Sequence, residues 1–153
     1  MDQNLTQISE AGAFGDFVQT FQIEDLNIRG RLVRLNQAFA DAVKAHGYPA
    51  PLAQLIGETM ILAAVLASAL KYEGIFTLQV QGDGPVSLIM ADITSDGAMR
   101  AYAKIREGVD GEAIAGNSIP QVIGAGHMAF TVDQGPDTDR YQGITELTGA
   151  SLA

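Results

Sequence analysis

The chain has 153 residues, of which 47% are hydrophobic, so it is about the size of one domain and can bury a core. Nine Lys and Arg residues against 18 Asp and Glu residues give a formal net charge of −9, which disfavours nucleic acid and anionic membranes as partners. The absence of cysteine excludes disulfides, thiolate nucleophiles and thiolate metal ligands. No basic, apolar signal peptide pattern is present, and we expect a cytoplasmic protein.

The N-terminal part divides into a leader and a strand. Residues 1–16 show no sustained periodicity, and we expect a flexible leader, followed by one domain over residues 17–153. From residue 17 the pattern is that of an extended chain. Three apolar side chains alternate with three polar ones, namely Leu26, Ile28 and Leu32 with Asn27, Arg29 and Arg31. This period of two predicts a strand whose polar face is turned outward.

Two helices are predicted next. Asn36 is placed to cap the first, which ends at Gly47. The second covers about residues 51–72, because residues 52–70 are apolar on every helical face. Residues 52–70 alone would span roughly 28 Å as a helix, which also allows a marginal membrane crossing, but the charge of Glu58 and several polar residues favour a buried core helix. A helix of this kind needs protein layers on both sides.

After Gly74 the hydrophobic period changes to two. Three strands on short turns are expected in sequence, which is typical of an antiparallel meander. A short helical turn and two more strands follow. The predicted strands are residues 76–80, 86–90, 99–105, 128–132 and 141–147, and the short helical turn is residues 117–124.

Glu58 is the most obvious candidate for catalysis, because a carboxylate in an apolar helix can have a raised pKa and act as a general acid. A catalytic pair needs a second titratable group, and none occurs at helical spacing, since Ile61 and Leu62 occupy those positions. A structural Glu, paired from elsewhere in the chain, is therefore the favoured interpretation.

Other candidate motifs are weaker. Residues 81–85 (QGDGP) and 124–126 (GAG) resemble phosphate loops, but they lack the P-loop Lys and Ser/Thr and do not lead into a helix, which favours turns. His46 and His127 are too few for a zinc site. The spacing of Asp133, Asp137 and Asp139 is not that of a calcium loop. No serine among Ser68, Ser87 and Ser118 lies in a nucleophile elbow.

One predicted strand face is basic. It carries Arg100, Tyr102, Lys104 and Arg106, a pattern that binders of single-stranded nucleic acid also use. Because the net charge is −9, a face paired with carboxylates or a protein interface is favoured. The residues alone therefore predict no catalytic, cofactor-binding or metal-binding site.

Seven segments, taken in this order, resemble the N-terminal domain of the 33-kDa heat-shock protein family, the redox-regulated holdase chaperones of bacteria. They are residues 28–33 (IRGRLV), 46–49 (HGYP), 70–74 (LKYEG), 77–85 (TLQVQGDGP), 97–100 (GAMR), 124–132 (GAGHMAFTV) and 141–144 (YQGI). The resemblance implies an α+β fold with three layers, in which the long apolar helix lies between two mostly antiparallel sheets. It also implies an ATP-independent chaperone that binds unfolding proteins under oxidative and heat stress, works in the cytoplasm and forms a homodimer.

The chain departs from this family in one respect. Family members bind zinc through a CxC and CxxC pair near the C-terminus, and oxidation of these cysteines activates the chaperone. This chain has no cysteine, so no zinc or redox residue is carried over. We therefore expect a domain truncated at its C-terminal end, without the zinc domain, and with uncovered apolar surface. Two other functions stay open, a dimerisation module inactive without the missing half and a small acid/base enzyme using Glu58.

Overall fold

The computed structural model describes residues 15–114 and 118–152, so most of the predicted leader lies outside the described residues. The elements in chain order are β1 (Phe17–Ile23), the short 3-10 helix η2 (Glu24–Leu26), β2 (Ile28–Arg34), α1 (Gln37–Lys44), α2 (Ala50–Ala67), β3 (Ile75–Gly82), β4 (Val86–Thr94), β5 (Met99–Ile105), the 3-10 helix η3 (Gly111–Ile114), α3 (Ile119–Val122), β6 (Gly126–Asp133) and β7 (Tyr141–Glu146).

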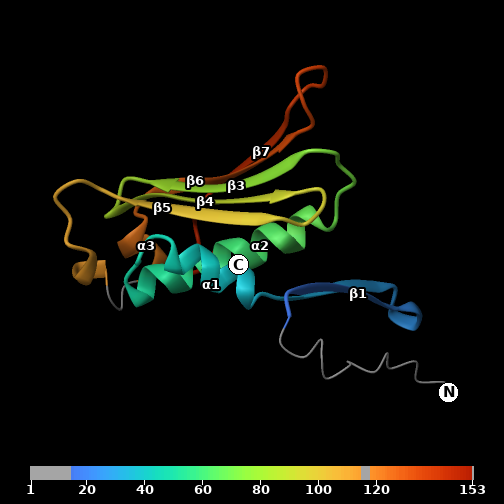
Figure 1. Ribbon diagram of the computed structural model, residues 1–153, viewed down its shortest axis with the longest axis horizontal. Helices are drawn as coiled ribbons and strands as arrows, with labels where there is room; N and C mark the ends of the chain where they lie inside the picture. Colours follow the sequence, from blue (N-terminus) through green and yellow to red (C-terminus); the bar gives the residue numbers. More distant parts are fainter. Residues whose placement is uncertain (1–14, 115–117, 153) are drawn as a thin grey trace.

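The described elements form three layers. Strands β3 to β7 make a five-stranded antiparallel sheet in the order β5-β4-β3-β6-β7, and β1 and β2 pair as a separate hairpin. Helix α2 lies between the large sheet and the hairpin (Figure 1), and α1 packs against α2 and β5. Helix α2 contacts β3, β4 and β5 on one side and β2 on the other. The predicted α+β fold with an apolar helix between antiparallel sheets is confirmed.

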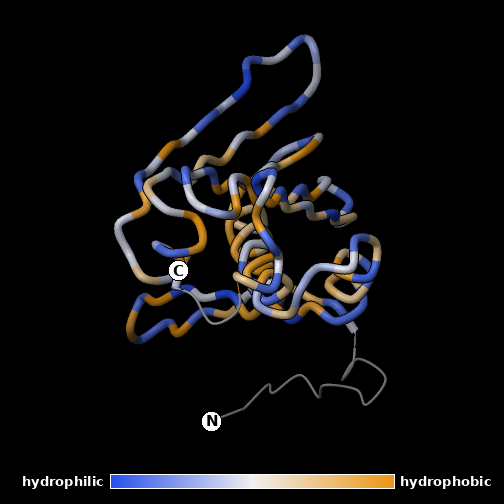
Figure 2. Tube along the Cα trace, turned by 90° about the vertical axis from the view of Figure 1, so that its left-hand side faces the viewer, coloured by the Kyte–Doolittle hydropathy of each residue, from blue (hydrophilic) through white to orange (hydrophobic). Residues whose placement is uncertain are grey.

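The large sheet has one apolar and one polar face, as the period of two predicts. On β3 the side chains of Phe76, Leu78 and Val80 are at most 1% exposed and belong to the core. They pack with Ile56 and Met60 of α2, which are fully buried. In Figure 2 the hydrophobic turns of this helix fill the centre of the molecule. The meander β3-β4-β5 is as predicted, and β6 returns to the free side of β3.

Helix α2 ends five residues before the predicted boundary at residue 72. The Ser68 hydroxyl donates to the carbonyl of Val65 (2.9 Å). The next two backbone N–H groups, of Ala69 and Leu70, donate to the carbonyls three residues earlier, Leu66 and Ala67, as in a 3-10 helix. These contacts stop the α-helical ladder at Ala67 although the apolar composition continues. The composition therefore does not define the C-terminal boundary.

The cover around α2 is also less complete than expected. Residues four and seven apart form a stripe that does not face the core, consisting of Gln54, Glu58, Ile61, Val65 and Ser68. Although the helix is long and apolar enough to cross a membrane, its other faces pack inside the protein. It is a core helix with one open stripe.

The two edges of the large sheet differ. At the β5 edge the Tyr48 hydroxyl accepts a hydrogen bond from the N–H of Ala103 (2.9 Å) and donates to the carbonyl of the same residue (3.3 Å). The ring of His46 lies 5.2 Å from that of Tyr48 and 5.8 Å from that of Tyr102, between centroids. The segment after α1 therefore closes the β5 edge, whereas β7 forms the other edge.

The face of the hairpin that is turned outward differs from the prediction. Leu32 and Ile28 are exposed, whereas Val33 packs against the core. Since Arg29 and Arg31 share the face of Val33, the polar side chains lie on the helix side and the apolar ones face outward. The predicted polar outer face is therefore wrong. Alternation shows which residues share a face, but not which face the rest of the chain covers.

Candidate functional site

Glu58 lies on the open stripe of α2 and not in the core. Its carboxylate accepts a hydrogen bond from Nε2 of Gln54 (3.1 Å), one helical turn earlier. No cluster of three or more His, Asp or Glu side chains suited to a metal occurs within residues 15–114 and 118–152. The partner of Glu58 therefore comes from the same helix, whereas the structural interpretation expected one from elsewhere in the chain.

The two histidines lie far apart on the sheet. His46 stands at the β5 edge, while His127 lies on β6 opposite Glu146, so β3 and β4 separate them. Asp133 of the acidic loop pairs with Nη2 of Arg140 (3.0 Å) at the base of the β6–β7 hairpin. These positions do not assemble a metal site in the described structure.

The glycine-rich segment at 81–85 is a structural turn. The N–H of Gly84 donates to the carbonyl of Ile123 (2.7 Å), and the Asp83 carboxylate accepts from the N–H of Ala125 (2.8 Å). A Cβ atom on Gly82 would lie 2.1 Å from the carbonyl oxygen of Ile123. Because its backbone groups are used and its space is filled by this second loop, the segment cannot hold a phosphate in this conformation.

The basic face of β5 is largely engaged within the chain. Nε of Arg100 contacts Oδ2 of Asp92 (2.6 Å), and the same carboxylate accepts from the Thr77 hydroxyl (2.6 Å). The guanidinium of Arg106 donates to the carbonyls of Gly82 and Gly84 (3.2 Å each). The pairing with a carboxylate favoured from the sequence is therefore present at Arg100.

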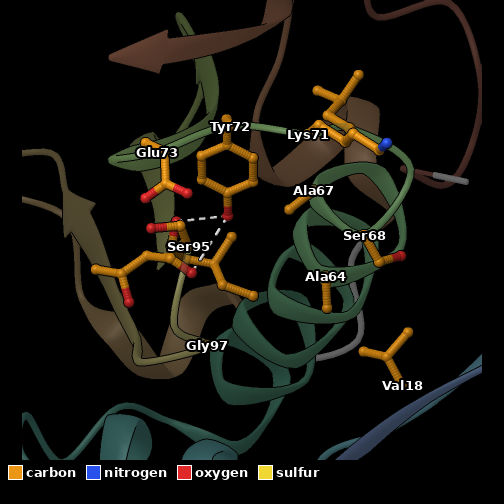
Figure 3. A pocket seen from close by; sticks show the side chains of 12 residues that line it. Val18, Ala64, Ala67, Ser68, Lys71, Tyr72, Glu73, Ser95 and Gly97 are labelled. Atoms are coloured by element: carbon orange, nitrogen blue, oxygen red, sulfur yellow. Dashed lines mark hydrogen bonds between the residues drawn. The ribbon is translucent and has the colours of Figure 1, made fainter. Parts of the chain in front are cut away.

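An open cleft of about 420 Å³ lies at the C-terminal end of α2 (Figure 3). Val18 of the hairpin, Ala64 and Ala67 of the helix and Ser95 of the β4–β5 turn line it. The Tyr72 hydroxyl in its wall bonds to the carbonyl of Ile93 (3.0 Å), and burial raises the pKa of this phenol above its ordinary value. Ser68, Lys71 and Glu73 also line the cleft, so its wall is partly polar and partly apolar.

Another apolar feature is the outer side of the β1–β2 hairpin. We name it the hairpin face, and it consists of Phe21, Ile23, Leu26, Ile28 and Leu32, which are all among the exposed large hydrophobic residues. The cross-strand register explains how the side chains meet.

Within the hairpin face, Ile23 stands opposite Ile28, and Phe21 stands opposite Gly30. A Cβ atom on Gly30 would lie 2.1 Å from Cζ of Phe21, so the tip of the aromatic ring occupies the space above the glycine. Contiguous exposed apolar side chains of this kind are typical of a protein-binding surface.

Comparisons with known proteins identify the family. The sequence model of the Hsp33 protein family matches residues 16–153. The chain belongs to the Hsp33 family. It is similar to the 33 kDa chaperonin of Caulobacter vibrioides, with 42% identity over 97% of this chain and 51% of that protein, and to that of Ectopseudomonas mendocina, with 37% identity over 90% and 45%.

The fold agrees with a solved member of the family. The crystal structure of the 33 kDa chaperonin from Thermotoga maritima superposes with a TM-score of 0.72 at 22% identity, and it covers 89% of this chain and 47% of that one. The chain spans about half the length of the curated relatives it matches. The resemblance found in the sequence is thereby confirmed for the N-terminal half, and the family is one of chaperones.

Sequence reasoning did not find the hairpin face. The alternation places Leu26, Ile28 and Leu32 on one face, but it does not show that this face is left uncovered. Phe21 belongs to the preceding strand, which the sequence did not separate from the second. The signal that identifies the face is the pairing of Phe21 with Gly30, which needs the register of the hairpin.

Proposed function

We propose that this chain is the N-terminal core of an ATP-independent holdase chaperone, which binds unfolding proteins under oxidative and heat stress in the cytoplasm. Membership of the Hsp33 family supports the chaperone role. The observation that carries the proposal is the hairpin face, because a holdase needs exposed apolar surface and no catalytic constellation.

The size of the hairpin face suits weak, reversible binding. Full burial of one large apolar side chain contributes about 1.5–3 kcal/mol, and these side chains are about half exposed in the free protein, from 44% for Ile23 to 64% for Leu26. Each one therefore has roughly 1 kcal/mol left to gain from contact with a client. Five such contributions, reduced by the cost of association, correspond to modest affinity.

The test is suppression of client aggregation, measured by light scattering with a chemically unfolded protein. We expect the wild-type chain to suppress aggregation, and the double variant Ile28→Thr plus Leu32→Thr to need a clearly higher concentration. Each substitution should weaken client binding about fivefold, since about 1 kcal/mol is lost per residue. Threonine keeps the β-branched shape or strand propensity that the hairpin requires.

The matched control is Ile61→Thr. It removes a similarly exposed side chain, 42% exposed against 47% for Ile28, from the open stripe of α2 and outside the hairpin face. The control should suppress aggregation as the wild type does. Equal activity of the hairpin double variant and the wild type would refute the role of this face.

A second candidate is a dimerisation module that is inactive without the other half of its relatives. The hairpin favours this reading because a two-stranded sheet with an exposed apolar face is marginally stable alone and gains from a partner. Sedimentation of the purified chain separates the candidates. A homodimer that loses its association in the hairpin double variant supports the module, whereas a monomer that still suppresses aggregation supports the holdase.

Zinc does not enter this proposal. In relatives with a CxC and CxxC pair, zinc would bind to thiolates, but this chain has no cysteine and its two histidines lie on opposite parts of the sheet. We likewise propose that neither nucleic acid nor a membrane is a partner. An acid/base reaction at Glu58 is the remote alternative, and its partner Gln54 does not support it.

A further inference from the structure

The outer edge of the large sheet, strand β7, has a row of backbone groups that face away from β6. The N–H of Leu147 donates to the carbonyl of Gly126 (3.0 Å), which extends the β6–β7 register. Because bonded and non-bonded pairs alternate in an antiparallel ladder, the N–H and C=O groups of Gln142, Ile144 and Glu146 point to the open edge. No backbone hydrogen bond between described residues uses those groups.

This edge lacks the protection found at the other end of the sheet. The Tyr48 hydroxyl occupies both backbone groups of Ala103 on β5. Strand β7 has the sequence YQGITE, with no proline, no lysine and a charge only at its last residue. Edge strands of this kind are templates for pairing with another extended chain.

An aromatic row leads from the core to this edge. The ring centroids of Tyr72, Phe76, Phe130 and Tyr141 follow one another at 6.4, 5.8 and 5.7 Å. Exposure rises from 0% at Phe76 to 64% at Tyr141, and Tyr72 at the other end of the row is half-buried. The ring of Phe130 lies over Gly143, where a Cβ atom would come within 2.3 Å of its Cε1. The glycine therefore leaves an apolar shelf beside the unpaired backbone groups.

We propose that β7 is a strand-addition edge that takes an extended apolar segment of an unfolded polypeptide. The added strand pairs with the backbone groups of Gln142, Ile144 and Glu146. One of its side chains packs beside Phe130 and Tyr141 above Gly143. Main-chain pairing does not depend on side-chain identity, so this mode suits many different clients.

Charge favours this occupant over a second copy of the chain. Glu146 lies on the strand, and Asp137 and Asp139 lie in the β6–β7 loop, which projects from the layers (Figure 1). Two copies, each with a net charge of −9, would bring these carboxylates together. A segment with lysine or arginine beside its apolar residues would complement them. The inference rests on the proposed binding of unfolded proteins and names a site for it.

The test is amide hydrogen exchange of this chain with a peptide of alternating valine and threonine flanked by lysines. At a peptide concentration ten times the Kd, exchange at Gln142, Ile144 and Glu146 should slow about tenfold. Exchange at Gly143 and Thr145, whose N–H groups already face β6, should change little. The same peptide N-methylated on the residues that face β7 should give no slowing.

Three results would overturn the proposal. The first is unchanged exchange at Gln142, Ile144 and Glu146 when the peptide is added. The second is equal slowing of exchange by the N-methylated peptide. The third is slowing of exchange that rises with protein concentration in the absence of peptide, which would identify a second copy as the occupant. This readout does not use client aggregation. The holdase proposal can therefore fail in light scattering while the edge is confirmed, or the reverse.

Two substitutions test the edge directly. Ile144→Pro removes an N–H that points away from β6, so it should spare the β6–β7 ladder. Ile144→Lys keeps the backbone and adds a protective charge. Ile144→Pro should weaken peptide binding at least about fivefold, corresponding to the loss of one main-chain hydrogen bond. Ile144→Lys should also weaken binding, because its ammonium group repels the lysines of the peptide. Ile61→Lys on α2 makes the same side-chain change elsewhere and should bind as the wild type; equal binding by all variants would refute the site.

Discussion

Replacement of Tyr48 by Phe tests whether one side chain closes the β5 edge. The substitution keeps the ring beside His46 and removes only the hydroxyl that bonds both to the N–H and to the C=O of Ala103. Ala103 is 5% exposed, so water replaces the lost partner poorly. Two hydrogen bonds at about 0.5–1.5 kcal/mol each, of which the 3.3 Å bond is the weaker, predict a loss of about 1–2 kcal/mol of unfolding free energy.

Urea unfolding measures this loss. For a chain of this size we expect the midpoint to fall by about 0.5–1 M with an unchanged slope. Amide exchange at Ala103 should accelerate as well, because its N–H loses its acceptor. The control is Tyr102→Phe on the same strand, since no hydrogen bond between described residues uses the Tyr102 hydroxyl. Unfolding of Tyr48→Phe within about 0.5 kcal/mol of the wild type, with unchanged exchange at Ala103, would refute the closure of this edge by Tyr48.

Two further predictions concern pH and packing. Burial raises the pKa values of Tyr48 and Tyr72 above the ordinary value of 10.0. As the pH rises, the two phenols therefore lose their protons in the unfolded chain before they do so in the folded chain. The stability that the two buried phenols contribute is complete below pH 10.0 and falls above it. Urea unfolding between about pH 9 and 11 should show this fall, and Tyr48→Phe should make it shallower; an equal slope would contradict the assignment to Tyr48. Gly143→Val should lower the unfolding free energy by about 1–3 kcal/mol, because a Cβ atom there meets the ring of Phe130. Gln142→Val, on the opposite face of β7, should change the unfolding free energy by less than about 0.5 kcal/mol, and equal effects of the two substitutions would show that the ring moves freely.

Local patterns predicted most of the secondary structure. Phe76, Leu78 and Val80 alternate with polar residues, and this period is sufficient for β3 because one face of the sheet is buried and the other is not. The end of α2 was missed for a local reason too, since the bond from Ser68 to Val65 competes with the helix although both residues tolerate helical structure.

The sites were less predictable because they depend on contacts between distant residues. Tyr48 and Ala103 are 55 positions apart, and nothing near either residue marks the closed edge. The same is true of Phe130 and Gly143, whose pairing follows from the β6–β7 register. Glu58 illustrates the opposite case, because its partner Gln54 lies four positions earlier on the same helix, a spacing that the sequence shows directly.

The position of α2 explains why both proposed binding sites are apolar and exposed. The helix packs on β3, β4, β5 and β2, so it covers the middle of the large sheet and one face of the hairpin. The outer side of the hairpin and the β6–β7 edge lie beyond its reach. Substitutions in the buried face of α2 should therefore reduce stability and both binding modes together. Substitutions at Leu32 or Ile144 should affect one binding mode each and leave the unfolding free energy nearly unchanged, because those side chains are 56% and 65% exposed. Binding and stability are thus carried by different residues, which allows each to be changed without the other.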